Sequence, residues 1–419
     1  MADIGDLVDV LTVREKISGI LIPGKNDAKI TLKLASGYNI SIFKKEIKKI
    51  QVIEPKKERK SKKKEVLQNP KLKTVYILHT GGTIASRVDY STGAVSARFS
   101  PTDIIEIVPE ISGVVNIKSK LVSNMFSEDI NFSHYNLIAK EIDQIKDECD
   151  GIIITHGTDT ITYTSCALAF ILEGIDKPVI LVGSQRSSDR PSSDAFLNLH
   201  MACRFIAESD FFGVAICMHE NLNDESCIIY NPCKTKKLHS SRRDAFKAIN
   251  SKPIARVSNI GVEFISKTHN KKGELTLRLF DEKLKIGLLF SHPNMTAQEV
   301  KTYSSFDGLI LVGTGIGHYP INKIDEYTSE NEQIYNEIKK LAKKIPVVMT
   351  TQTVYGRLNL NVYSTGRKLL EAGVLGDQLD ILYESSLIKL AWLLSNHKDK
   401  VRELFSKDFH GEISKRSEE

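Results

Sequence analysis

Two threonine-rich segments of this 419-residue chain carry side chains that could attack a carbonyl group. They are residues 79–86 (HTGGTIAS) and residues 155–160 (THGTDT). A threonine hydroxyl becomes a nucleophile when a base takes its proton and fixed donors stabilise the charge that develops on the attacked carbonyl oxygen. Thr83 and Thr158 supply hydroxyls, and Asp159 supplies a carboxylate. This combination predicts acyl transfer through a threonine.

Both segments follow apolar runs that would place them at one edge of a sheet. The runs are residues 75–78 (VYIL) and 151–154 (GIII), of the kind that forms buried parallel strands. In an open α/β sheet, ligands bind beyond the carboxyl ends of the strands, so we expect the two segments to face one site. Gly81 and Gly82 would allow a sharp turn that brings backbone N–H groups close to a ligand.

The predicted chemistry also needs a base. Residues 234–246 (KTKKLHSSRRDAF) contain lysines, of which one could work in its neutral form if it is desolvated. His156 beside Asp159 is the alternative, as a relay of the serine–histidine–aspartate kind. We favour the lysine, because a histidine in a loop at a strand end often serves only as a hydrogen-bonding group.

The two segments resemble the signature loops of the bacterial-type L-asparaginases and glutaminases, which hydrolyse side-chain amides through an acyl-threonine. The motifs that carry this resemblance are TGGTIA at residues 80–85 and HGTDT at residues 156–160. The likeness extends from residue 73 to about residue 400. It implies a two-domain α/β body, and the alternation of apolar runs with helical patterns independently predicts a parallel sheet covered on both sides.

The resemblance implies a role for each matching residue. Thr83 falls on the family's nucleophile, and Tyr90 falls on the tyrosine of a mobile loop that assists it. Thr158 and Asp159 fall on the second threonine and its aspartate. Lys237, nine residues before the phenylalanine of an Ala-Phe pair, falls on the family's buried lysine.

The resemblance also implies how the substrate is held. Ser127 looks like the serine that binds the substrate α-carboxylate, and Asp159 falls on a residue of the same binding site. Backbone N–H groups around Gly82 and Gly157 are candidates for the oxyanion site. Glu128 stands where free-standing asparaginases commonly have a glutamine, which leaves the choice between glutamine and asparagine open.

The residues before the body predict a small all-β domain, because residues 29–34 and 37–42 alternate polar and apolar side chains with period two. The sequence LIPG followed by LKLASGYNI resembles the amino-terminal module of the D-type subunit family of archaeal glutamyl-tRNA(Gln) amidotransferases. We therefore expect an α/β, two-domain L-asparaginase-like body preceded by a small β-barrel. The expected parts are a barrel at 1–54, a basic linker at 55–72, an α/β domain with the catalytic loops at 73–270 and a second α/β domain at 271–419.

This second resemblance implies partners and cofactors. The ammonia would pass to a synthetase-like amidotransferase subunit of the E type, which binds Glu-tRNA(Gln) and uses ATP and Mg²⁺, while this chain binds no cofactor or metal itself. The sequence agrees, because residues 313–318 (GTGIGH) place a histidine at the sixth position of a dinucleotide-binding loop and no P-loop motif occurs. The family also implies a homodimer within a heterotetramer, with glutamine or asparagine as the small-molecule substrate.

The composition indicates a chain without membrane spans or a secretion signal. No apolar run approaches the roughly 18 residues of a transmembrane helix, and the first residues lack the pattern of a signal peptide. The six cysteines are scattered without a Cys-x-x-Cys pair, which is typical of reduced thiols and not of a metal site. We therefore expect a cytoplasmic location.

The net charge of +6 is concentrated in the linker. Residues 56–65 hold seven basic and two acidic side chains, which sum to +5 and leave about +1 for all other residues. A solvated spacer between domains is the simplest interpretation. A segment that attracts tRNA or an acidic partner by long-range steering is the alternative.

Two rival functions remain open from the sequence. The chain could be a self-sufficient cytosolic L-asparaginase with an accessory module, or an inactive scaffold that binds RNA or a partner through the module and the linker. Ammonia release that rises with the synthetase-like partner and Glu-tRNA(Gln) would distinguish the amidotransferase function from both.

Overall fold

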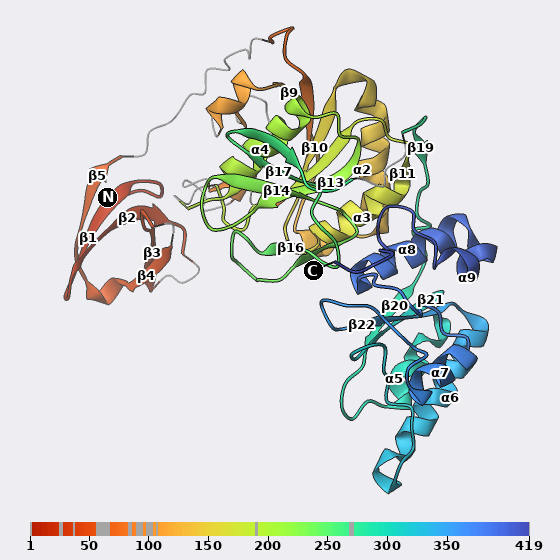
Figure 1. The fold of residues 1–419 in the computed structure, drawn as a ribbon. Coiled ribbons are helices and arrows are strands. Elements are labelled where there is room, and N and C mark those ends of the chain that lie inside the picture. Colours follow the sequence, from red (N-terminus) through yellow and green to blue (C-terminus); the bar gives the residue numbers. More distant parts are fainter. Residues whose placement is uncertain are drawn as a thin grey trace.

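The computed structural model describes most of the chain. The described residues are 2–24, 28–36, 38–55, 68–82, 86–88, 95–97, 104–105, 108–188, 192–267 and 272–418, with the backbone alone at 86–88 and 95–97. Residues 56–67 of the basic linker, Thr83 and Tyr90 lie outside them. In Figure 1 the amino-terminal sheet stands apart from a body made of two α/β parts.

The amino-terminal part is a five-stranded antiparallel sheet. Its strands, in the order β4-β3-β2-β1-β5, are β1 (Leu7–Thr12), β2 (Lys16–Ile22), β3 (Lys29–Lys33), β4 (Asn39–Phe43) and β5 (Ile47–Glu54). The two edge strands are joined by the short 3₁₀ turn Lys44–Glu46, which can span about 14 Å, whereas the edges of a flat five-stranded sheet are about 19 Å apart. The sheet must therefore curl, and the predicted all-β domain is confirmed.

This small sheet has its own core. Val8, Val10, Leu32 and Ile42 are buried together inside the curl. Val8 and Val10 alternate with outward-facing residues of β1, as the period-two pattern of a half-buried strand requires. The sheet can therefore bury a core without the body.

The first part of the body is built on an eight-stranded mixed sheet with the order β18-β17-β14-β13-β12-β10-β6-β9. Five strands run parallel to their neighbours, and they are β6 (Thr74–Gly81), β9 (Asn116–Met125), β10 (Gly151–Thr155), β12 (Pro178–Val182) and β13 (Gly213–His219). An antiparallel extension consists of β14 (Ser226–Tyr230), β17 (Ala255–Ser258) and β18 (Gly261–Phe264). The apolar runs predicted at 75–78 and 151–154 thus form adjacent parallel strands.

Helices cover both faces of this sheet. They are α2 (Phe132–Ile145), α3 (Ile161–Ile171) and α4 (Ala195–Glu208). Two hydrophobic clusters result, one with α2 and α3 and one with α4. The N-cap of α2 is Asn131, whose Oδ1 accepts a hydrogen bond from the Ser133 N–H.

The second part of the body has a three-stranded parallel sheet in the order β20-β21-β22. The strands are β20 (Ile286–Phe290), β21 (Gly308–Gly313) and β22 (Val347–Thr351), and the helices are α5 (Ala297–Lys301), α6 (Ser329–Lys344), α7 (Ser364–Glu371), α8 (Tyr383–Asn396) and α9 (Val401–Leu404). Helix α8 lies between the two parts, where it packs on α3 and on β21 (Figure 1). The predicted body of two α/β parts is confirmed.

Three short ribbons complete the described strands. They are β7 (Ser86–Val88) with β8 (Val95–Ala97), β11 (Leu172–Glu173) with β19 (Thr276–Leu277), and β15 (Thr235–Lys237) with β16 (Phe246–Ala248). Because β19 pairs with β11, the chain stays on the first α/β part until shortly before β20. The predicted boundary at 270/271 lies outside the described residues.

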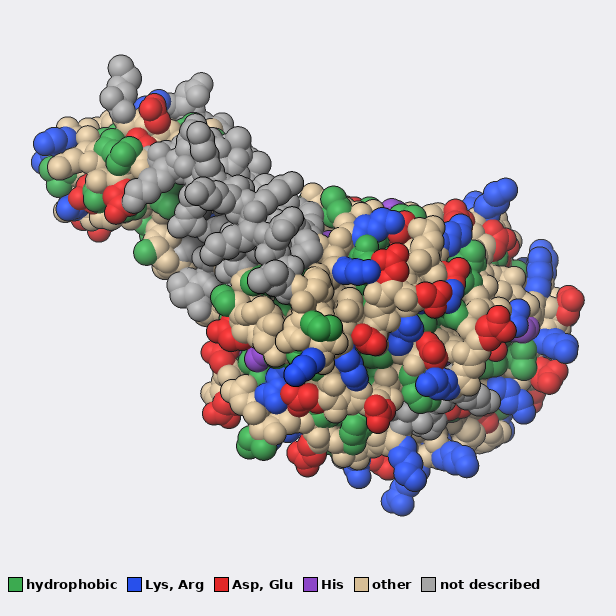
Figure 2. All heavy atoms as spheres, turned by 90° about the horizontal axis from the view of Figure 1, so that it is seen from above, with side chains coloured by type: hydrophobic (Ala, Val, Ile, Leu, Met, Phe, Trp, Pro, Cys, Tyr) green, Lys and Arg blue, Asp and Glu red, His purple; other side chains and the backbone are tan. Residues whose placement is uncertain are grey.

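On the face of the body that Figure 2 shows, acidic and basic side chains are interspersed. This mixture agrees with the near-neutral charge inferred for the residues outside the linker. Within the ranges that the structure describes, no helix combines the length and apolar character needed to cross a membrane.

Candidate active site

The two threonine-rich segments lie side by side at the carboxyl ends of adjacent strands. Strand β6 pairs in parallel with β10, with His79 opposite Thr155. Beyond this pair the backbones touch, because a Cβ added at Gly82 would lie 2.8 Å from the backbone nitrogen of Gly157. Gly82 also has a φ of +81°, a backbone conformation that residues other than glycine rarely adopt. A glycine is therefore required at this contact on two grounds.

A third strand end brings Ser127 to the same place. Strand β9 ends at Met125, and a Cβ added at Gly157 would lie 2.7 Å from the Cβ of Ser127. The Thr160 hydroxyl donates a hydrogen bond of 2.6 Å to the Ser127 carbonyl, which ties the two loops together. Ser127 is buried, whereas Glu128 is exposed.

Lys237 reaches the site from a different direction. It ends the short strand β15, opposite Phe246 of β16, whose side chain is fully buried in the core. The Lys237 Nζ donates hydrogen bonds of 2.8 Å to Thr158 Oγ1 and of 2.8 Å to Asp159 Oδ1. The lysine side chain is 13% exposed, but Asp159 is 69% exposed. An amine, a hydroxyl and a carboxylate from segments about 80 residues apart thus form one hydrogen-bonded group.

This group can move a proton. A neutral lysine amine can accept a proton from the threonine hydroxyl, and the adjacent carboxylate stabilises the ammonium that forms. The Asp159 carboxylate also faces solvent, where a substrate ammonium group could reach it. The arrangement can therefore activate a hydroxyl or a water at the edge of the sheet.

His156 takes no part in this group. Its Nδ1 lies 2.7 Å from the Gly157 carbonyl and its Nε2 lies 2.8 Å from Thr164 Oγ1 in α3. Burial lowers the pKa of His156 to about 4, so the ring is neutral at pH 7. One ring nitrogen is thus engaged within the loop and the other holds the loop against α3, which argues against the relay alternative.

Two of the predicted residues cannot be placed. Thr83 and Tyr90 lie outside the described residues. The structure brings the other predicted residues to the ends of neighbouring strands or to the lysine that meets them: Gly82, Ser127, Glu128, Gly157, Thr158, Asp159 and Lys237.

Sequence reasoning missed one residue that supports the site. Asp194 is fully buried, and its carboxylate accepts hydrogen bonds from the backbone N–H groups of Gln185 at 2.9 Å and Arg186 at 3.0 Å. It thereby holds the loop after β12, in which a Cβ added at Gly183 would lie 2.8 Å from the Cγ2 of Thr158. The sequence signal was an aspartate directly before α4, which indicates a helix cap and does not distinguish a loop clamp.

Comparisons with known proteins first define the class of this fold and site. The family model "Asparaginase, N-terminal" matches residues 74–270, and "Glutaminase/Asparaginase C-terminal domain" matches residues 285–405. The thermostable L-asparaginase from Thermococcus kodakarensis superposes with a TM-score of 0.71 at 31% identity, over 81% of this chain and 99% of its own. L-asparaginase I from Vibrio cholerae gives a TM-score of 0.70 at 26% identity, over 82% and 99%. The body is that of an L-asparaginase-like amidohydrolase.

Full-length relatives then identify the family. A model described as "GatD N-terminal domain" matches residues 2–53. The GatD subunit of glutamyl-tRNA(Gln) amidotransferase from Methanococcus maripaludis is 40% identical over 98% of both chains, and that from Pyrococcus furiosus is 40% identical over 98% of this chain and 95% of its own. The chain belongs to the GatD family of glutamyl-tRNA(Gln) amidotransferase subunits, as an amidase-type subunit with an asparaginase body.

Proposed function

We propose that the chain releases ammonia from the side-chain amide of glutamine or asparagine through an acyl-threonine. Thr83 Oγ forms a bond to the amide carbon, the carbon–nitrogen bond breaks, and the nitrogen leaves as ammonia with the proton that Thr83 gave up. Water then attacks the ester, which returns the proton to Thr83 and releases the free acid. Splitting the cleavage into two acyl transfers lowers each barrier.

The single observation that carries the proposal is the contact of Lys237 Nζ with both Thr158 Oγ1 and Asp159 Oδ1. Such a group has no structural need to sit at the end of a parallel sheet, where ligands of this fold class bind. In the proposal, Thr158 and Lys237 either prime the attack of Thr83 or take the proton from the hydrolytic water. Tyr90 assists Thr83.

Substrate binding follows from the three loops that meet at Gly157. We assign Ser127 to the substrate α-carboxylate and the exposed Asp159 to its ammonium group. Backbone N–H groups near Gly82 and Gly157 would hold the oxyanion, because the close approach of the two backbones brings both loops to the same end of the sheet as Ser127. The exposed Glu128 is the residue that we assign to the choice between glutamine and asparagine.

The ammonia serves a second subunit in this proposal. Membership of the GatD family supports a synthetase-like partner of the E type that holds Glu-tRNA(Gln), activates its glutamate with ATP and Mg²⁺, and accepts the ammonia to form Gln-tRNA(Gln). We assign no nucleotide or metal ligands to this chain, and within the described ranges no cluster of three or more metal-binding side chains is present. The proposed assembly is a homodimer of this chain within a heterotetramer. Its proposed location is the cytoplasm, as for the "Probable Cytoplasmic L-asparaginase" from Campylobacter jejuni, which has a TM-score of 0.61 at 25% identity.

Ammonia release from glutamine tests the proposal against its rivals. The purified chain should release ammonia slowly, and the rate should rise strongly when the synthetase-like partner and Glu-tRNA(Gln) are added. Rapid hydrolysis of asparagine by the chain alone would favour the self-sufficient asparaginase. Absence of release under both conditions would favour the scaffold.

A further inference from the structure

Three lysines within four residues each contact a carboxylate, and two of them connect strand β15 and the residue just before it to the second part of the body. The Lys234 Nζ lies 2.9 Å from Asp380 Oδ1, and both side chains are fully buried. Lys236 forms an ion pair with Glu384, in which the two side chains are 15% and 9% exposed. Lys237, on the opposite side of the strand from Lys236, carries the proposed catalytic amine. Strand β15 therefore joins the candidate active site to the segment that leads into α8.

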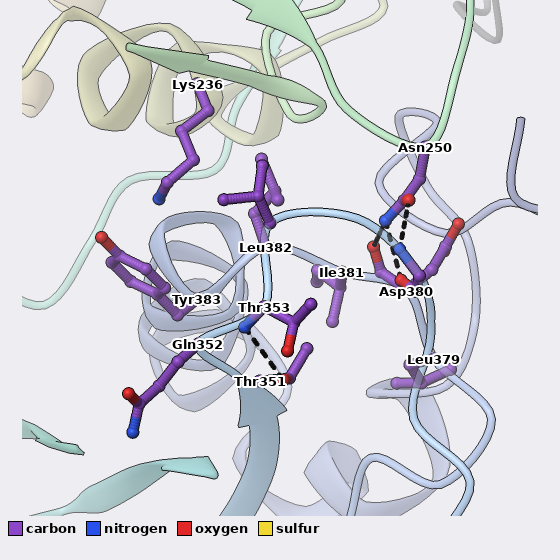
Figure 3. Close-up of a pocket in the computed structure, with 12 residues that line it drawn as sticks. Lys236, Asn250, Thr351, Gln352, Thr353, Leu379, Asp380, Ile381, Leu382 and Tyr383 are labelled. Carbon is purple, nitrogen blue, oxygen red and sulfur yellow. Dashed lines mark hydrogen bonds between the residues drawn. The ribbon is translucent and has the colours of Figure 1, made fainter. Parts of the chain in front are cut away.

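The contact of Lys236 is built from two groups of the first turn of α8. Its Nζ lies 3.9 Å from the centre of the Tyr383 ring as well as against the Glu384 carboxylate. Figure 3 shows the Lys236 side chain extending from its strand toward Tyr383 at the wall of a small pocket between the two parts of the body. The other carboxylate oxygen of Glu384 is buried and has no hydrogen-bond partner among the described residues. The charge of Glu384 is thus balanced chiefly by Lys236.

The ribbon that carries Lys237 needs such support. Strands β15 and β16 have three residues each, and an isolated two-stranded ribbon is only marginally stable in water. Ser385 Oγ adds a hydrogen bond of 2.7 Å to the Cys233 carbonyl, just before the strand. Helix α8 also packs on α3, which begins at Ile161 directly after the Thr158 loop. The same helix therefore supports both the amine and the hydroxyl of the candidate site.

We propose that Lys236 and Glu384 are positioning residues, which hold β15 so that the Lys237 amine meets Thr158. The placement of the second α/β part then sets the amidase rate, and a partner that shifts α8 would change that rate through this ion pair. This inference rests on the proposed role of Lys237. Lys236 does not touch the substrate, because its side chain lies on the other side of the strand.

Steady-state kinetics of ammonia release test the inference in the full chain assembled with its synthetase-like partner. Lys236→Met and Glu384→Gln should each lower kcat by about tenfold or more while KM changes by less than about twofold, because a displaced base slows the reaction without removing a substrate contact. Lys236→Arg should keep most of the activity, since it keeps the charge and the stacking on Tyr383. The double variant should lose little more than either single variant.

The matched control is Lys247→Met on the same ribbon. Lys247 pairs with Lys236 across the two strands, yet its side chain is 43% exposed and makes no contact with the second part that the structure records. This variant should keep kcat within about twofold. A loss equal to that of Lys236→Met, or unchanged kcat in both Lys236→Met and Glu384→Gln, would overturn the inference. Full activity of Lys237→Met would instead overturn the proposed function, whatever the other variants do.

Discussion

At the residue scale, the account depends on one amine that contacts two partners of different chemistry. Lys237 is buried along its stem and holds Thr158 and Asp159 at hydrogen-bond distance. A base and a fixed positive charge would both explain that geometry. An arginine at this position could supply the fixed positive charge but could not act as the base, because a guanidinium does not lose its proton in proteins.

Replacement of Lys237 distinguishes these two roles. Lys237→Met should lower kcat by roughly 10²- to 10⁴-fold, the usual contribution of a general acid or base. Lys237→Arg should be as inactive as Lys237→Met if the lysine is a base. Single-turnover ammonia release measures both, and an arginine variant with near-normal turnover would show that only the charge is needed.

A second residue-scale prediction concerns the buried histidines. Burial lowers the pKa of His156 to about 4 and that of His79 to about 4, from an ordinary value near 6.5. The unfolded chain therefore binds more protons than the folded chain between about pH 6.5 and pH 4, and the free energy of unfolding must fall as the pH falls through this window.

Urea denaturation at several pH values measures this fall. The expected loss is on the order of 1 kcal/mol or more for each histidine by pH 4. His156→Gln should flatten the pH dependence while it lowers the free energy of unfolding at pH 7. An unchanged pH dependence in that variant would contradict the assignment.

At the scale of elements, the site exists because the ends of three strands approach one another more closely than side chains allow. The contacts between Gly82 and residues 156–157, and between Gly157 and Ser127, leave no room for a Cβ. Gly82→Ala should therefore separate the loops, abolish most of the activity and destabilise the fold by about 1–3 kcal/mol.

Gly261→Ala is the matched control for Gly82→Ala. Gly261 also has a positive φ of +144°, but the nearest neighbour of an added Cβ is 3.9 Å away, and the residue begins β18 far from the candidate site in the sheet order. The Gly261→Ala variant should be destabilised by backbone strain alone, as measured by thermal unfolding. It should keep full activity, as measured by ammonia release. Equal losses of activity in the two variants would contradict the close-approach argument.

The buried pair of Lys234 and Asp380 gives a prediction for the connection between the two parts of the body. Lys234→Met should destabilise the chain by about 3 kcal/mol, because it removes the nearer of the two cations of the buried Asp380 carboxylate and leaves only Arg357, at 3.8 Å. The double variant Lys234→Met/Asp380→Leu should lose less than the single variant. Chemical denaturation measures both, and a more severe loss in the double variant would show that the pair is not a coupled unit.

The sequence could predict the elements but not the contacts that fasten them. Apolar runs identify β6 and β10, because a strand that is buried on both faces is apolar along its whole length. The exact start of α2 could not be predicted, because Asn131 and Ser133 are both residue types that favour an N-cap.

The residues of the candidate site also fall into those that the sequence could predict and those that it could not. Thr158, Asp159 and Lys237 could be selected from motifs, and their contact is now visible. The clamp by Asp194 and the pairs of Lys234 and Lys236 could not be predicted, because each joins residues distant in sequence and a charged residue in a pattern does not reveal its partner.

At the scale of the whole molecule, the two α/β parts are joined by a shared hydrophobic cluster. This largest cluster runs from α2 and α3 through β21 to α8, and each part has a further cluster of its own. Trp392, the single tryptophan of the chain, lies buried in α8 within this cluster. The body should therefore unfold as one unit.

Urea unfolding followed by two independent spectroscopic signals tests this prediction. The urea midpoint followed by Trp392 fluorescence should equal the midpoint followed by far-ultraviolet circular dichroism, apart from the minor contribution of the amino-terminal sheet. A tryptophan transition at clearly lower urea would show that the second part unfolds separately and that α8 does not join the two.

The most direct test of the central claim is the partition of the acyl group between water and hydroxylamine. An acyl-threonine can be captured by hydroxylamine, so the assembled enzyme with glutamine should form the γ-glutamyl hydroxamate in a ratio to glutamate that rises linearly with hydroxylamine concentration. Thr83→Ala should form neither product, and Lys237→Met should form both at a rate lower by at least about 10²-fold. Release of ammonia and glutamate by the unaltered chain with no hydroxamate at any hydroxylamine concentration would contradict a covalent intermediate, and with it the account of this site.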